Sequence, residues 1–184
     1  RPTSGCNGPG GIKCQSRRRQ RAVDPGVRRL VVAQSPDRTA TNQATWVAVQ
    51  EFIRRFPNDA TWGLWRRNVL ALLDEAIDAG LDKHFRAGQS MQHIILSTAS
   101  EHGLESIEPP PPRVTIAFAE DKGLLVALSR ANIWFASAER TSEIPEIGGL
   151  QVLAGYLKQL WEQTRPEESM PLALRSITDS QAAP

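Results

Sequence analysis

Four consecutive prolines, residues 109–112, are the feature that most constrains how this chain can fold. Each ring locks φ and removes a backbone donor, so the run fixes an extended, polyproline-like connector. Before it, apolar residues recur with the 3.6-residue period of a helix. Directly after it, they alternate with the period of a strand. Proline runs also resemble ligands of aromatic-grooved modules, but a spacer is the interpretation we prefer.

Three helices are expected before the prolines. The first carries apolar residues on one side from Trp46 to Phe56 and ends at Pro57. The second follows an apolar arc from Trp62 to Ile77, and Gly80 supplies its left-handed stop. The third is expected over Ser90–Leu104, which begins with a good N-cap residue and ends in a glycine followed by an apolar residue. A strand is the less favoured alternative for this segment.

Strands follow the prolines. Alternation predicts one over Val114–Phe118, and a turn leads to a second over Leu124–Ser129. A third strand is expected over Ala131–Ser137. An amphipathic helix is expected to follow, with its apolar face running from Leu150 to Trp161 and its end after Arg165, where Pro166 stops it. Because helices and strands occur in separate runs, the predicted fold class is α+β, with N-terminal helices, a three-stranded antiparallel meander and a C-terminal helix.

Charge and composition divide the chain into three parts. Residues 1–43 carry nine basic and two acidic residues with almost no periodic apolar residues, and we expect a disordered basic tail. Residues 44–175 are expected to form a single α+β domain, and residues 176–184 a flexible C-terminus. The first methionine is Met91, so whether residues 1–43 belong to the native protein stays open.

Several classes of function find no support in the sequence. The two cysteines, Cys6 and Cys14, fit neither a zinc motif nor a disulfide framework, and no cofactor motif occurs, so we expect no metal and no cofactor. No apolar run is long enough for a membrane span, so we expect a soluble protein. The expected domain contains no cysteine, which fits a reducing cytoplasm, and we expect the protein to be cytoplasmic. Nucleic-acid binding would depend on the basic tail alone and is the least favoured alternative.

One segment suggests catalysis. His93, Ser97 and His102 lie within the third expected helix, and His93 and Ser97, four residues apart, would share one helical face. A small hydrolase using these three residues is therefore one alternative function. The two histidines would lie on opposite sides of a helix and could not share a metal. Because mid-helix amides are already bonded, the segment lacks oxyanion donors, and we prefer a solvated polar face.

The function we favour is that of a small non-catalytic binding or accessory protein. Trp134 is expected to point away from the core face of the meander, together with Leu125 and Ala127. A sheet covered by helices on one side would leave this second face open to a protein partner or to a second copy of the chain. Covering by another segment of the same chain is the competing expectation.

Overall fold

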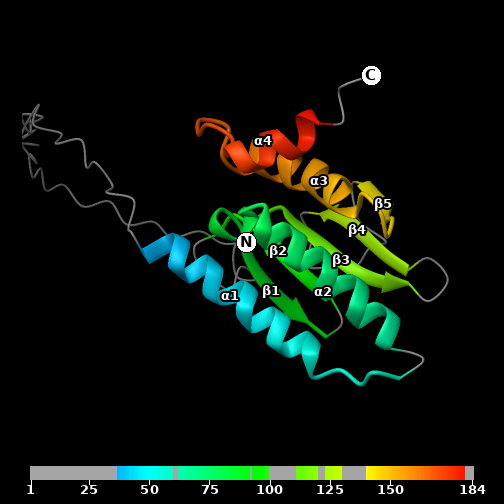
Figure 1. Cartoon of the computed structure of the whole chain (residues 1–184). Coiled ribbons are helices and arrows are strands. Elements are labelled where there is room, and N and C mark those ends of the chain that lie inside the picture. The colour runs from blue at the N-terminus through cyan, green and yellow to red at the C-terminus, as the bar shows by residue number, and fades with distance from the viewer. Residues whose placement is uncertain are drawn as a thin grey trace, which may run out of the picture. The chain divides into compact units, whose positions relative to one another are not determined.

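The computed structural model of the chain describes residues 37–59, 62–91, 93–99, 111–119, 123–129 and 140–180, all of which belong to one compact unit. The fold is α+β, with helices packed against an antiparallel sheet (Figure 1). Its elements in chain order are α1 (Asp37–Arg54), α2 (Gly63–Asp78), the 3-10 helix η1 (Leu81–Lys83), β1 (Arg86–Ser90), β2 (His93–Ser97), β3 (Arg113–Ala119), β4 (Gly123–Ser129), β5 (Arg140–Ile144), α3 (Gly149–Thr164) and α4 (Leu172–Asp179).

The described sheet has five strands in the order β1-β2-β3-β4-β5, so the expectation of a three-stranded meander is wrong in its strand number. Every neighbouring pair is antiparallel. The predicted hairpin of β3 and β4 is present, with Val114 opposite Leu128 and Ile116 opposite Val126. The strand expected over Ala131–Ser137 lies outside the described residues.

The prediction of a helix over Ser90–Leu104 is also wrong, because His93–Ser97 is strand β2. Its residues alternate between the two faces of the sheet: Ile94 and Leu96 are fully buried, whereas Ile95 is only half-buried. Leu96 lies opposite Val114, and Ile94 lies opposite Ile116. β-branched side chains favour this pleated arrangement, and pairing with β3 outweighs the helix-capping signals of the sequence.

The described helices pack on one face of the sheet. Residues from α1, α2, α3 and α4 share a single hydrophobic cluster with the alternate residues of β2, β3 and β4 that face them. Two ladders form the floor of this core, Leu96–Val114–Leu128 and Ile94–Ile116–Val126. α4 contacts α3 and adds Leu174 to the cluster. α1, α2 and α3 thus bury apolar side chains against one sheet face, whereas α4 packs on α3 (Figure 1).

The outer face of the sheet carries smaller side chains. One row of opposed residues crosses all five strands, namely Gly88, Ile95, Thr115, Ala127 and Thr141. A neighbouring row contains Ala117 and Leu125. None of these residues belongs to the buried cluster that the helices share with the inner face.

Side chains of α1 form hydrogen bonds with the backbone of β1, an edge strand of the sheet, and with the backbone just before it. The Trp46 indole nitrogen donates to the carbonyl of Phe85 at 2.8 Å, and Thr45 Oγ1 accepts from the backbone nitrogen of Ala87 at 3.1 Å. Asn42 Nδ2 donates to the carbonyl of Lys83 at 3.2 Å. Such contacts satisfy backbone groups that an edge strand would otherwise leave unpaired.

α1 begins earlier than the domain boundary expected from the sequence. The helix starts at Asp37, and Asn42, which the sequence analysis assigned to the tail, is 2% exposed. Its amide is one of the groups that hold η1. Residues 37–43 therefore contribute to the folded unit.

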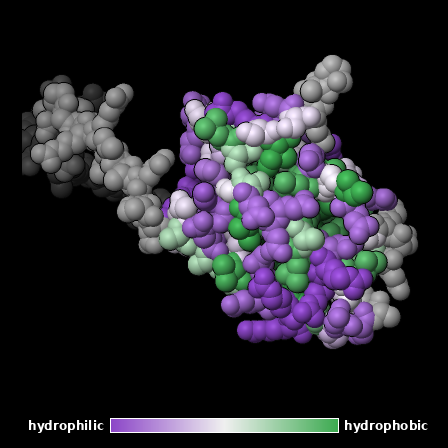
Figure 2. Space-filling view, in the orientation of Figure 1, coloured by the Kyte–Doolittle hydropathy of each residue, from purple (hydrophilic) through white to green (hydrophobic). Residues whose placement is uncertain are grey.

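The face of the molecule shown in Figure 2 has a mixed surface. In the view of Figure 2, hydrophobic residues are interspersed with hydrophilic ones. The exposed large hydrophobic residues come from separate elements and turns: Val47, Leu64, Met91, Ile147 and Leu172. Within the described part of the chain, no helix is both long and apolar enough to span a bilayer.

Candidate functional site

His93 and Ser97, the two described residues among the weak candidates for catalysis, do not lie within hydrogen-bonding reach of each other. His93 and Ser97 are both on β2 and on the same face, but four residues of strand separate them by about 13 Å. No direct hydrogen bond can join side chains so far apart. The His93 ring nitrogen Nδ1 instead lies 3.3 Å from the carbonyl oxygen of Ser90. His102 lies outside the described residues.

The residues predicted for partner binding are only partly described. Leu125 and Ala127 do lie on the outer face of the sheet, as expected from the alternation of β4. Leu125 is half-buried, whereas Ala127 is 1% exposed and offers almost no surface to a partner. Trp134 lies outside the described residues, so its role stays a prediction.

A cavity of about 430 Å³ opens where β2 ends. We call it the Thr98 cavity. Cavities of this size accommodate small organic molecules. Its lining comes from the end of β2, the residues before β3, and the end of α3 with the segment that follows: Ser97, Thr98, Ala99, Pro111, Pro112, Gln163, Thr164, Arg165 and Glu168.

Two arginines meet at the Thr98 carbonyl; Arg165 lines the cavity, whereas Arg38 is not one of its lining residues. Arg165 Nη2 donates to the carbonyl oxygen of Thr98 at 3.0 Å, and Arg38 Nη2, from the first turn of α1, donates to the same oxygen at 2.6 Å. Burial, followed by repulsion from Arg165, lowers the pKa of Arg38, and Glu168 opposes this shift. Since arginine stays protonated in proteins, two positive charges lie side by side here.

One carboxylate among the described residues pairs with these charges. Arg165 Nη1 donates to both carboxylate oxygens of Glu168, at 2.7 and 2.8 Å. The Arg165 side chain is 16% exposed and that of Glu168 is 46% exposed. Among the residues that the structure describes, the buried Nε of Arg165 finds no hydrogen-bond partner. The guanidinium is thus mostly desolvated but incompletely satisfied, which is costly without a further acceptor.

The ring of Trp161 packs against the guanidinium group of Arg165. The guanidinium carbon of Arg165 lies 5.3 Å from the centre of the Trp161 ring, and the His84 ring meets the same indole edge-on at 6.2 Å. Burial, with Lys83 and then Arg38 as weaker causes, lowers the pKa of His84, and Asp82 opposes the shift. His84 therefore favours its neutral form near the two arginines.

Two of the three hydroxyl groups in the described lining of the cavity, those of Thr98 and Thr164, are hydrogen-bonded. Thr98 Oγ1 donates to Thr164 Oγ1 at 2.9 Å, and Thr164 Oγ1 donates to the carbonyl of Leu160 at 2.8 Å. The acceptors of these two hydroxyl protons are another hydroxyl group and a backbone carbonyl, neither of which acts as a general base. This arrangement positions lone pairs and rigid walls for binding, but it does not activate a nucleophile.

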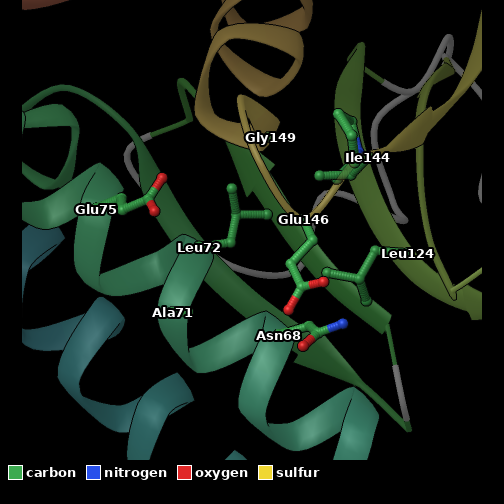
Figure 3. A pocket seen from close by; sticks show the side chains of 9 residues that line it. Asn68, Ala71, Leu72, Glu75, Leu124, Ile144, Glu146 and Gly149 are labelled. Carbon is green, nitrogen blue, oxygen red and sulfur yellow. The ribbon is translucent and has the colours of Figure 1, made fainter.

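A second, smaller cavity of about 80 Å³ lies between α2, β4 and the start of α3 (Figure 3). In this view the carboxyl groups of Glu75 and Glu146 lie on opposite sides of the Leu72 side chain. Its walls include the apolar side chains of Leu124 and Ile144. Among the described residues, no group of three His, Cys, Asp or Glu side chains could hold a metal ion. We interpret this cavity as a small gap in the packing between these elements, with the carboxylates of Glu75 and Glu146 at its edge.

One residue of the Thr98 cavity, Ser97, was a candidate from the sequence, but the cavity and its arginines were not predicted. Arg38 had been assigned to the tail and Arg165 to the end of a helix, and no sequence motif links them. Only the pairing of β2 with β3 and the packing of α1 and α3 bring both to Thr98. Comparison with protein-family models, with curated proteins and with solved structures gives no match for this chain.

Proposed function

We propose that the protein is a small non-catalytic binding protein and that the Thr98 cavity is its ligand site. One observation carries the proposal: Arg38 and Arg165 converge on a single carbonyl oxygen beside a cavity of about 430 Å³. The engaged hydroxyls of Thr98 and Thr164 favour binding over catalysis.

Native mass spectrometry of gently purified protein tests this proposal. The protein should carry a small molecule of fixed mass, and Arg165→Gln should lose it while keeping its fold. Arg54→Gln is the matched control, since Arg54 is an exposed arginine at the other end of α1. If Arg165→Gln retained the molecule, or if Arg54→Gln lost it equally, the Thr98 cavity would not be the ligand site.

Self-association through the outer sheet face is a second candidate function. It is favoured by the small side chains on that face and by the packing of the described helices against the opposite face. Because Ala127 is buried, such a contact would involve Ile95, Thr115 and Leu125, which are half-buried. Light scattering over a range of protein concentrations tests it, since a protein that stays monomeric throughout does not self-associate.

A further inference from the structure

We infer that the Thr98 cavity binds the phosphate group of a small organic phosphate monoester, and that Glu168 is the internal anion that this phosphate displaces. The inference rests on the proposed function and specifies its ligand. It is carried by the charges and donors around Thr98, by the size of the cavity, and by the position of Glu168.

The charge at the site fits a dianion. Arg38 and Arg165 contribute two positive charges that share one acceptor, the Thr98 carbonyl. Glu168 offsets one of them through its ion pair with Arg165. If Glu168 leaves, two charges remain, and a phosphate monoester carries nearly two negative charges at neutral pH. Guanidinium groups are the side chains best suited to phosphate, because several donors lie in one plane and can bind two oxygens together.

The position of Glu168 makes it replaceable. Its carboxylate is nearly half exposed, and it belongs to the segment between α3 and α4 rather than to either helix. Arg165, by contrast, is held by the Thr98 carbonyl and by the Trp161 ring. A phosphate can therefore take the place of the carboxylate while the guanidinium keeps its position. Glu168 occupies the anion position weakly, as a half-exposed ion pair does.

The remaining walls favour an organic body on the phosphate. The cavity is of the size that holds whole small molecules, so an inorganic phosphate would leave most of it to water. Pro111, Pro112 and Ala99 provide rigid apolar surface beside the polar end. An organic phosphate that covers these residues would gain from burying them, which inorganic phosphate cannot do.

Calorimetric titration of the full chain tests the inference with phenyl phosphate, inorganic phosphate and benzoate as probes. Phenyl phosphate should bind most tightly, because only it combines a dianion with an apolar body. Arg38→Gln and Arg165→Gln should each weaken its binding by about tenfold or more, the loss expected for a charged hydrogen bond. Arg54→Gln, the matched control, should bind like the parent protein.

Glu168→Gln gives the decisive result. Removal of the competing carboxylate should tighten phenyl phosphate binding, whereas a purely structural role for Glu168 would leave it unchanged or weaken it. Should the two arginine variants fail to fold, Arg38→Lys and Arg165→Lys keep the charge while losing the planar donor pair, and both should bind more weakly than the parent. Unchanged or weaker binding by Glu168→Gln, or equal affinity for benzoate and phenyl phosphate, would overturn the inference.

Two further outcomes separate this inference from the proposed function. A carboxylate or neutral molecule that depends on Arg165 would leave the ligand site in place but reject the phosphate. Binding of none of the probes, with no molecule in the native mass spectrum, would reject both.

Residues 100–110, the part of the chain between Ala99 and Pro111 of the cavity lining, contain three further carboxylates, Glu101, Glu105 and Glu108. If phenyl phosphate bound only after their replacement by glutamine, the chain's own carboxylates would be the occupants, and the inference would be wrong.

Discussion

Arg38 and Arg165 donate hydrogen bonds to the same acceptor, the carbonyl oxygen of Thr98, at 2.6 and 3.0 Å. One residue lies in the first turn of α1, and the other directly follows α3. The end of β2 therefore joins the first and third helices of the fold. Because both lone pairs of this carbonyl are engaged, the two guanidinium groups are held next to each other despite their repulsion.

Thr45→Val should destabilise the protein by about 1–3 kcal/mol, because the backbone N–H of Ala87 loses its acceptor while the side-chain shape is nearly kept. Urea denaturation measures the change. Thr141→Val is the control: Thr141 is exposed on β5, and its replacement should change stability by no more than about 0.5 kcal/mol. Equal effects of the two substitutions would show that Thr45 does not secure the edge of β1.

Two glycines of α3 should respond to alanine in opposite directions. A Cβ at Gly149 would lie 2.7 Å from Ile144 Cγ2, whereas a Cβ at Gly155 would meet nothing within 4 Å. Gly149→Ala should therefore lower the melting temperature by disturbing the contact between α3 and β5. Gly155→Ala should raise stability by up to about 1 kcal/mol, since alanine is favoured in a helix interior. Thermal melts of both variants decide whether α3 packs as described.

His84 should make the protein less stable in mild acid. Its pKa is lowered in the folded state, so the unfolded chain binds the proton more readily. Stability should be unaffected by this group well above pH 6.5 and should decrease as the pH falls through about 6.5, the ordinary histidine pKa, toward the lower folded value. Denaturation at several pH values between about 8 and 5 measures this dependence.

Carboxylates also change stability in acid, so the contribution of His84 is the difference between the pH dependence of stability of the parent protein and that of His84→Gln. The parent should lose more stability than the variant over the same range. Because His84 is only half-buried, the difference should be small. Identical pH profiles would show that the ring does not resist protonation in the fold.

Self-association through the outer sheet face predicts a specific pair of effects. Leu125→Asp should produce monomers under conditions in which the parent protein is dimeric, because it places a charge in the apolar contact. Trp134→Ala should weaken association by ~2 kcal/mol or more, as expected for an aromatic anchor, and leave the monomer folded. Phe135 follows Trp134 in the strand expected over Ala131–Ser137 and so should face the core, because strand neighbours point to opposite faces. Phe135→Ala should therefore destabilise the monomer by about 3–5 kcal/mol as a core truncation. If Trp134→Ala unfolds the monomer equally, Trp134 belongs to the core.

The parts of the fold that follow local signals were predictable from the sequence. α2 ends before Gly80, whose φ of 80° is the left-handed stop that its position predicts. The alternation in β3 and β4 correctly predicted a hairpin, and the apolar period of α3 correctly predicted a helix. In each case, the spacing of apolar residues that is buried in the fold also matches the secondary structure that these residues prefer locally.

The first two strands depend on tertiary contacts instead. β1 has the sequence Arg-Ala-Gly-Gln-Ser, which has little preference for strand, and it is held by Thr45 and its neighbours in α1. Its connection to β2 includes Met91, whose φ is 54°. Glycine or asparagine at this position would have indicated a hairpin turn in the sequence, whereas methionine does not. The Thr98 cavity was unpredictable for the same reason, since packing alone unites Arg38 with Arg165.

A crystal structure of the protein with phenyl phosphate, at a concentration that saturates binding by calorimetry, tests the central claim most directly. We predict phosphate oxygens within hydrogen-bond distance of both Arg38 and Arg165, with the Glu168 carboxylate displaced from the 2.7 Å pairing that it makes with Arg165. The phenyl ring should lie against Pro111 and Pro112. Density for the phosphate at another surface, with the Arg165–Glu168 pair intact, would contradict the account.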